Sequence, residues 1–228
     1  MKLIVSYFSR SSSVRATKIK CKISKKGKFS EYFIDSDISE IKKHNLDFIL
    51  RFGFGIIRGD ILNTAKYGVW SYHHDDEEKY RGGPPCFWEI YNNDNITGSI
   101  LQRLTNKLDS GIVLRKGFLK TSCSYVRNRD QMYFESSRWP IQVCTDILNG
   151  NINYLDSHPS ATKAQIYFTP TNIQFIIFFL KSNLKKIKNF LSDKAFSNYW
   201  NIGVANAPIH SFLKENNDSS VKWFPNLP

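Results

Sequence analysis

Short apolar runs alternate with polar punctuation over the first 120 positions of the chain. The runs predict strands, which we place at Leu3–Tyr7, Tyr32–Ile34, Asp47–Phe54, Val69–His73, Ser99–Leu104 and Ile112–Thr121. Between them, short helices are expected at Ile38–His44, with Asp37 as the N-cap, and at Asp60–Lys66 and Cys86–Tyr91. Strands that alternate with short helices are typical of an α/β sheet.

The pattern changes after Ser122. Arg127–Asp130 predicts a charged loop, and Trp139–Asn149 predicts a helix that ends at Gly150. Residues 171–194 have apolar side chains at helical spacings and lysines on the other side. The apolar positions are Ile173, Ile176, Ile177, Leu180, Leu184, Ile187 and Leu191. A basic amphipathic helix of this kind can lie on a membrane, but it more often packs on its own protein or on a partner.

We therefore predict an α/β core over residues 1–121 and a helical extension and connector over residues 122–228. The 228 residues are 41% hydrophobic and 14% aromatic, which is enough for a packed core. No stretch reaches the roughly 18 apolar residues of a membrane-spanning helix, and no secretory segment is visible. The four cysteines lack the spacing of a metal site and indicate a reduced protein. The expected compartment is the cytoplasm.

The chain is basic, with 32 Lys and Arg against 20 Asp and Glu, a formal charge of +12. Two clusters, Lys18–Lys28 and Lys181–Lys194, carry much of this charge. Nucleic acid, phosphorylated substrates or a membrane surface would each suit such a balance. A solvated basic surface with no binding role is the simplest interpretation.

Residues 68–113 carry the candidate chemistry. His73 ends a predicted strand, where open α/β sheets bind ligands, and Asp109 lies in a turn before another strand. A carboxylate near an imidazole can orient it and stabilise its charged form. Ser71 shares a strand face with His73. The run His73–Glu78 does not predict a metal site, because successive strand residues face opposite ways.

Several residues of this stretch occur in the order of a known motif: His73, Arg81, Gly82, Pro85, Thr97, Gly98, Leu108, Asp109 and Gly111. The stretch resembles the catalytic core of the formyltransferases that use 10-formyltetrahydrofolate, a family that includes methionyl-tRNA and sugar N-formyltransferases. Residues 47–57 also resemble the strand and loop that lead into the folate pocket of that family. The resemblance covers roughly residues 40–120 and implies a Rossmann-like core.

The resemblance implies roles for individual residues. The catalytic residues would be His73, Asp109 and Ser71, where the family has asparagine at the position of Ser71. The cofactor 10-formyltetrahydrofolate would contact Phe52, Gly53, Phe54, Gly55, Ile56, Thr97 and Gly98, and the substrate would contact Arg81, Gly82 and Pro85. A primary amine would attack the formyl carbon, with Asp109 holding His73, His73 handling the proton and Ser71 donating to the oxyanion.

The acceptor that we predict is a nucleotide-linked amino sugar, whose phosphates suit the positive charge. A transfer RNA is the second possibility. Two further readings stay open: a catalytically degenerate module that binds folate or sugar, and an RNA-binding protein. Val221–Pro228 resembles the entry to a further domain of a glycan-related protein, so a fused or partner domain after Pro228 is expected.

Overall fold

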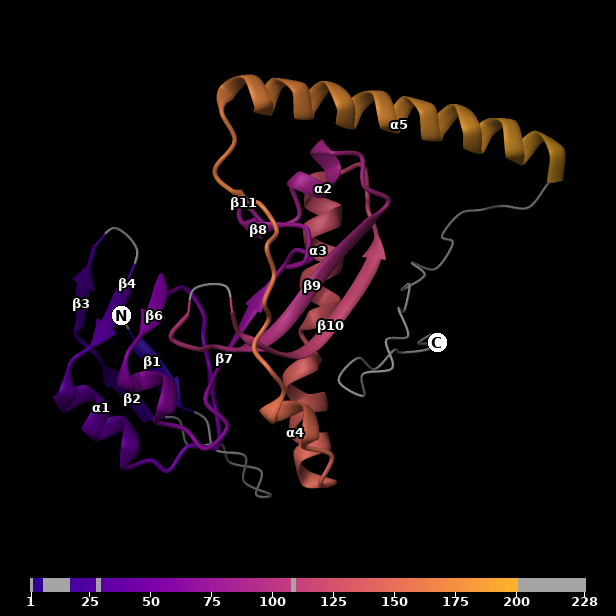
Figure 1. The fold of residues 1–228 in the computed structure, drawn as a ribbon. Coiled ribbons are helices and arrows are strands. Elements are labelled where there is room, and N and C mark those ends of the chain that lie inside the picture. Colours follow the sequence, from indigo (N-terminus) through magenta and orange to yellow (C-terminus); the bar gives the residue numbers. More distant parts are fainter. Residues whose placement is uncertain (1, 6–16, 28–29, 108–109, 201–228) are drawn as a thin grey trace. The chain divides into compact units, whose positions relative to one another are not determined.

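The computed structural model describes residues 2–5, 17–27, 30–107 and 110–200. These residues fold as two compact units, whose elements are labelled in Figure 1. Unit 1 comprises residues 1–72, 102–113 and 155–161, and unit 2 comprises residues 73–101, 114–154 and 162–228. The predicted division of the chain between residues 121 and 122 stays a prediction.

Unit 1 is built from short strands and small helices. Its elements are β1 (Lys2–Val5), β2 (Thr17–Lys20), β3 (Ile23–Lys26), β4 (Ser30–Phe33), α1 (Asp35–Lys42), β5 (Ile49–Leu50), β6 (Ile56–Arg58), the 3-10 helix η1 (Asp60–Asn63) and most of β7 (Val69–His73). Strands β1 and β2 pair antiparallel, as do β3 and β4, whereas β4 and β6 pair parallel.

A single hydrophobic cluster holds unit 1 together. Ile38 and Ile41 lie three positions apart on α1, so they share a helix face, and both are buried against Phe33, Ile57 and Val69. The helix ends at Lys42, and Asn45 follows with a φ of 45°, a left-handed conformation that asparagine tolerates better than most residues.

A four-stranded sheet in the order β10-β9-β7-β5 contains the strands of the candidate chemistry. Its other members are β9 (Ile96–Arg103) and β10 (Ile112–Lys120). Strands β5 and β7 pair parallel, with Ile49 opposite Val69 and Leu50 opposite Trp70. The parallel pair, the mixed sheet and its helices confirm the α/β class and the Rossmann-like core predicted from the sequence.

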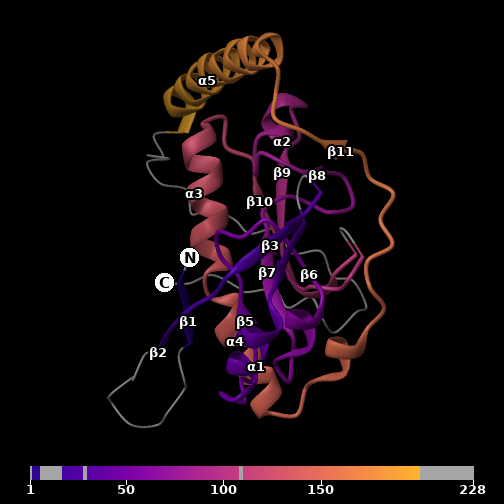
Figure 2. The ribbon, with the colours of Figure 1, turned by 90° about the vertical axis from the view of Figure 1, so that its left-hand side faces the viewer.

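Unit 2 adds helices to the long strands. Its further elements are β8 (Arg81–Gly82), α2 (Trp88–Tyr91), α3 (Tyr125–Ser136), α4 (Trp139–Leu148), β11 (Ile166–Tyr167) and α5 (Asn172–Trp200); a second 3-10 helix, η2 (Asn153–Asp156), is shared between the units. Figures 1 and 2 show α3 beside the β9 and β10 strands. Gly117 of β10 permits the close approach of α4, because a Cβ there would lie 2.8 Å from the ring of Trp139, the first residue of that helix. The mainly helical character of the extension is confirmed.

Several local predictions are corrected by the structure. Arg127–Asp130 is not a loop: it lies inside α3, which begins after Ser124, whose hydroxyl caps the Arg127 N–H. Asp37 is not the N-cap of α1 but lies in its first turn, where its carboxylate accepts from the Lys22 N–H. The composition of Asp94–Gly98 predicts a turn, but the second half of this stretch is a strand, because β9 begins at Ile96.

Candidate active site

Strand β7 brings Ser71 and His73 to the candidate site. The strand spans the predicted residues, Val69 to His73. Its first three residues are buried, and the Trp70 ring stacks on Phe48 with 4.0 Å between centroids. Burial then decreases toward the carboxyl end, where His73 is half-buried. The apolar start anchors the strand, and its end presents the imidazole.

In unit 1, Arg51 joins Ser71 to the predicted cofactor loop. Its guanidinium Nη1 donates to Ser71 Oγ at 2.7 Å, and its Nη2 donates to the Phe54 carbonyl oxygen at 2.5 Å. The exposed Phe52 ring lies 6.0 Å from the Tyr72 ring. The structure therefore gathers the Phe52–Ile56 loop and Ser71 around one cation.

The environment of Arg51 suits a group that stabilises negative charge. Burial lowers the pKa of Arg51, and the nearby Glu31 carboxylate opposes this effect. The pKa of a guanidinium is so high that a lowered value still leaves it charged at neutral pH. Its Nε has no hydrogen-bond partner among the described residues. A charge-assisted donor of this kind is stronger than a neutral amide.

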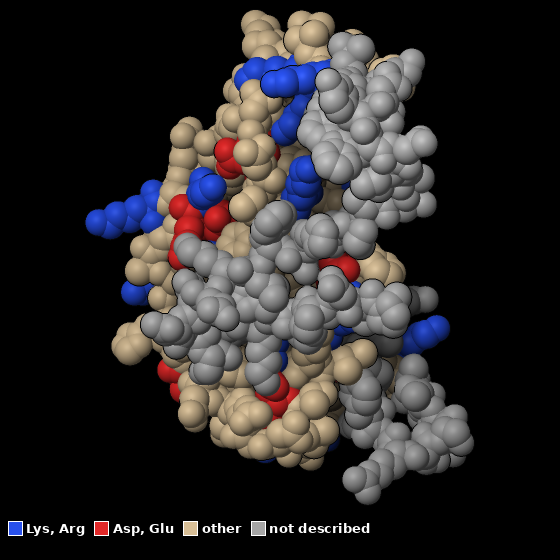
Figure 3. Space-filling view, turned by 90° about the vertical axis from the view of Figure 1, so that its right-hand side faces the viewer, with Lys and Arg blue, Asp and Glu red and all other residues tan. Residues whose placement is uncertain are grey.

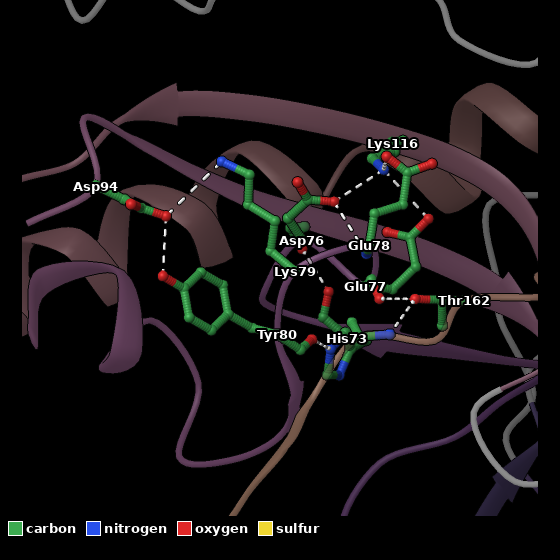
Figure 4. A network of polar contacts seen from close by, with 11 residues as sticks. His73, Asp76, Glu77, Glu78, Lys79, Tyr80, Asp94, Lys116 and Thr162 are labelled. Carbon is green, nitrogen blue, oxygen red and sulfur yellow. Dashed lines mark hydrogen bonds and ion pairs between the residues drawn. The ribbon is translucent and has the colours of Figure 1, made fainter. Parts of the chain in front are cut away.

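In unit 2, the His73 ring contacts the loop that follows it. His73 Nε2 lies 3.0 Å from the carbonyl oxygen of Tyr80 (Figure 4). A carbonyl only accepts, so Nε2 carries the proton in this arrangement. The Tyr80 hydroxyl in turn donates to Asp94 at 2.9 Å and fixes the far side of the loop.

The acidic loop after His73 is folded inward rather than solvated. Asp75, Asp76 and Glu77 are all buried. Lys116 of β10 lies between the carboxylates of Asp76 at 2.9 Å, Glu77 at 3.2 Å and Glu78 at 3.4 Å (Figure 4). Burial lowers the pKa of Lys116, but the carboxylates outweigh it and raise the pKa overall. We refer to Lys116 with these three carboxylates as the lysine clamp.

A second acidic pair lies deeper in unit 2. Glu89 of α2 is fully buried, and its carboxylate oxygens have no hydrogen-bond donor among the described residues. Burial and the neighbouring Glu89 charge raise the pKa of Asp75, whose carboxylate accepts from the Cys86 N–H at 2.7 Å. Burial also raises the pKa of Glu89, to about 7. Two carboxyl groups both accept, so they can pair only when one is protonated.

The residues predicted to bind substrate and cofactor in unit 2 have clear structural contacts. Gly82 has a φ of 91°, and a Cβ there would lie 2.1 Å from the Tyr167 carbonyl oxygen, because β8 pairs with β11. Thr97 is buried, and its hydroxyl forms hydrogen bonds with the Thr121 hydroxyl and with the side-chain amide of Asn128. A Cβ at Gly98 would lie 2.7 Å from that of Asp76. Their ligand-binding roles stay predictions.

Three other residues were predicted for the site: Asp109, Arg81 and Pro85. Asp109 lies outside the described residues, so its predicted pairing with His73 stays a prediction. Arg81 Nη1 is 3.4 Å from the carbonyl oxygen of Ala164, and Pro85 begins the turn that leads from β8 to α2. The described part of the chain contains no group of three or more His, Cys, Asp or Glu placed to hold a metal ion, and no helix there is long and apolar enough to cross a membrane.

No protein-family model matches the chain. Among curated proteins, the methionyl-tRNA formyltransferase of Prochlorococcus marinus is 32% identical over 113 residues, which are 49% of this chain and 32% of that protein. That of Clostridium perfringens is 34% identical over 80 residues, 35% of this chain and 26% of the relative. The bifunctional polymyxin resistance protein ArnA of Wigglesworthia glossinidia brevipalpis is 34% identical over 84 residues, 36% and 13% of the two chains.

The resemblance to the formyltransferase family is confirmed. The chain spans about a third of the length of the first methionyl-tRNA formyltransferases that it matches. Among solved structures, the methionyl-tRNA formyltransferase from Clostridium thermocellum aligns with a TM-score of 0.44 at 15% identity, covering 63% of this chain and 65% of that one.

Three residues of this formyltransferase-like core were not predicted from the sequence: Arg51, Glu89 and Lys116. Each acts on a partner that is distant in the chain, since Ser71 lies 20 positions from Arg51 and Glu77 lies 39 positions from Lys116. One signal was available for Arg51, because a charged residue inside an otherwise apolar run, FILRFGF, must find a partner when the run is buried.

Proposed function

We propose that this chain carries the core of an enzyme that transfers a formyl group from 10-formyltetrahydrofolate to a primary amine. The sequence relatives support this proposal, since they are formyltransferases and their similarity covers about half of the chain. The observation that carries it is the contact between Arg51 and Ser71 at the position of the family's catalytic asparagine. This contact places a guanidinium beside the Ser71 hydroxyl, whereas the sequence alone indicates the hydroxyl only.

In this proposal Arg51 and Ser71 together stabilise the oxyanion. The amine nitrogen attacks the formyl carbon, the carbonyl electrons move to oxygen, and the bond from carbon to the folate nitrogen then breaks. Ser71 Oγ accepts from Arg51, so its own proton is available to the oxyanion. That proton now points to the Tyr72 carbonyl at 3.3 Å, longer than a usual O–H···O bond, and a ligand oxygen can replace this contact.

His73 and Asp109 would move the amine proton. His73 ends β7 two residues beyond Ser71, and its Nε2 contact with Tyr80 holds the ring in place. Asp109 would orient His73 and stabilise its charged form, as the resemblance implies. The folate would bind beside the Phe52–Ile56 loop with Thr97 and Gly98, and Arg81, Gly82 and Pro85 would face the acceptor.

The acceptor that we propose is a nucleotide-linked amino sugar, since its phosphates suit a chain with a formal charge of +12. Methionyl-tRNA is the second candidate, because the curated relatives carry that name. The two make different predictions: formylation of transfer RNA should weaken steeply with added salt, as many phosphate contacts are lost. A sugar nucleotide has few phosphates, so its turnover should respond weakly.

The test is formyl transfer followed by mass spectrometry, with the full chain, 10-formyltetrahydrofolate and both acceptor classes. We expect His73→Ala to abolish the product, whereas His158→Ala, at an exposed histidine, leaves it unchanged. Ser71→Ala and Arg51→Met should each lower the rate by about 10²–10³-fold, and Ser71→Asn should retain it. Near-normal turnover by His73→Ala would refute the mechanism.

Thermal unfolding with 5-formyltetrahydrofolate separates catalysis from binding. A ligand at 100 times its dissociation constant stabilises a protein by about 2.7 kcal/mol. Stabilisation without formyl transfer to any amine would identify a degenerate binding module instead of an enzyme. An unchanged melting temperature together with no product would reject both readings.

A further inference from the structure

Helix α5 packs on unit 2 through one side. Phe178 stacks on Phe87 with ring centroids 4.3 Å apart and planes 18° apart. On the same side, the Ser182 hydroxyl donates to the Cys123 carbonyl, and Lys181 Nζ donates to the Tyr91 carbonyl oxygen at 2.8 Å. Figure 1 shows α5 running across the end of the unit that contains α2. These contacts determine which side of the helix faces outward.

The outward side of α5 is apolar and exposed. Seven large residues on it are between 56% and 71% exposed: Ile173, Ile176, Phe179, Leu180, Leu184, Ile187 and Phe190. At 100° per residue they occupy one continuous arc, which Asn183 interrupts between Ile173 and Phe190. Soluble proteins rarely expose an apolar patch of this extent unless it binds something. We call these seven residues the apolar arc.

The charge of α5 has one sign. Between Asn172 and Phe190 the helix carries four lysines and no acidic residue. Helical spacing places Lys186 along one border of the apolar arc and Lys188 along the other, and both are exposed. In Figure 3, blue side chains lie among tan atoms at the top of the view, where Figure 1 shows α5.

We propose that α5 binds the surface of an anionic lipid bilayer, with its axis in the plane of the membrane. The apolar arc would enter the boundary between headgroups and acyl chains, and the bordering lysines would reach the lipid phosphates on their long stems. Lysines on both borders favour a surface that surrounds the helix with negative charge. A second copy of α5 would instead bring lysines against lysines, which is repulsive.

The test is co-sedimentation of the full chain with vesicles of phosphatidylcholine, with and without phosphatidylglycerol. We expect binding to the anionic vesicles that falls with added salt, and weak binding to pure phosphatidylcholine. Lys186→Gln with Lys188→Gln should lower the partition coefficient by about 30-fold, since each lysine near an anionic surface contributes about fivefold. The matched control, Lys18→Gln with Lys20→Gln, removes the same charge from exposed positions of β2 and should change little.

The contribution of the apolar arc is tested by Leu180→Asp combined with Leu184→Asp, which should abolish vesicle binding. Leu148→Asp on α4, at a leucine that is 85% exposed, is the control and should bind as before. Equal binding to neutral and anionic vesicles, or no binding by the unaltered chain, would overturn the proposal. So would light scattering that shows a dimer which Leu180→Asp with Leu184→Asp converts to monomer without any vesicle binding.

Discussion

The loop after His73 contributes to two groups of carboxyls, which are buried apart from Glu78 and differ in how their charge is balanced. In the lysine clamp, Lys116 faces Asp76, Glu77 and Glu78. In the second group, no lysine or arginine among the described residues forms an ion pair with Asp75 or Glu89. The carboxyls of the first group can be ionised because the Lys116 ammonium balances their negative charge. The burial of Asp75 and Glu89 is tolerated because a bound proton replaces the missing cation.

The difference shows two ways in which an acidic sequence can be buried. A buried cation turns three carboxylates into a crosslink between the loop and β10. Asp75 and Glu89 can be joined only if one of them is protonated, so the strength of this contact would depend on pH. The loop thus carries one fixed attachment and one that changes with acidity.

The largest effect should come from removing the cation of the clamp. We expect Lys116→Met to lower the free energy of unfolding by about 3–5 kcal/mol, because Asp76 and Glu77 are left buried with uncompensated charge. Urea denaturation monitored by circular dichroism measures this change. The control Lys120→Met lies on the same strand at an exposed position and should change stability by less than about 0.5 kcal/mol. Equal losses in the two variants would contradict the comparison.

A smaller, pH-dependent effect is expected at Glu89. An unfolded glutamate releases its proton near pH 4.5, whereas burial raises the pKa of Glu89 to about 7 in the folded protein. Between these values the folded state holds a proton that the unfolded state has lost, so stability falls as pH rises from 4.5 to 7. As the pH rises across this window, the free energy of unfolding of Glu89→Gln should therefore increase by on the order of 2 kcal/mol relative to that of the unaltered protein.

The Glu89 prediction is measured as the difference between two stability curves. His74 works in the opposite direction, because burial and the neighbouring His73 lower its pKa to about 4. Stability from His74 is present above pH 6.5 and is lost as the pH falls toward 4. This contribution is common to both proteins and cancels in the difference. Glu135→Gln, at a partly exposed glutamate of α3 that pairs with Arg138, is the control. A difference curve no steeper than that of the control would refute a shared proton.

The smallest effect on stability is expected at an exposed ion pair of the same loop, which tests whether burial or charge number decides the cost of losing a lysine. Lys79 lies 3.8 Å from Asp94, with 58% of its side chain exposed, beside the same loop. Lys79→Met makes the chemical change of Lys116→Met at a solvated pair, and we expect a loss below about 0.5 kcal/mol because water screens it. A loss comparable to that of Lys116→Met would show that charge number, not burial, governs the loop.

Local patterns predicted the central strands well. Val69–His73 begins with apolar residues and follows Gly68, so both its type and its bounds follow from neighbouring positions. Strands β9 and β10 were found for the same reason. Asp47–Phe54 is also apolar, yet the strand is limited to Ile49 and Leu50 because β7 pairs with those two residues alone.

Features set by distant partners were not predictable in this way. Asp76 and Glu77 look solvated in the sequence, and their burial is explained by Lys116, which comes from another strand. The segment Arg127–Asp130 has the composition of a loop, but Asn128 turns inward and its amide joins Thr97 to the Cys86 carbonyl. Within the candidate site, Ser71 and His73 could be named from their motif, whereas Arg51 required the fold.

The pairing of β8 with β11 gives the extension a further property. The parallel contact of Arg81 and Gly82 with Ile166 and Tyr167 is reinforced by Thr162, whose hydroxyl donates to the Glu77 carbonyl oxygen. Phe178 adds a ring stack on Phe87. These attachments do not depend on the peptide bonds between α4 and β11. We therefore expect the two segments to remain associated after the chain between them is cut, like the halves of a split reporter, through backbone hydrogen bonds and aromatic contacts.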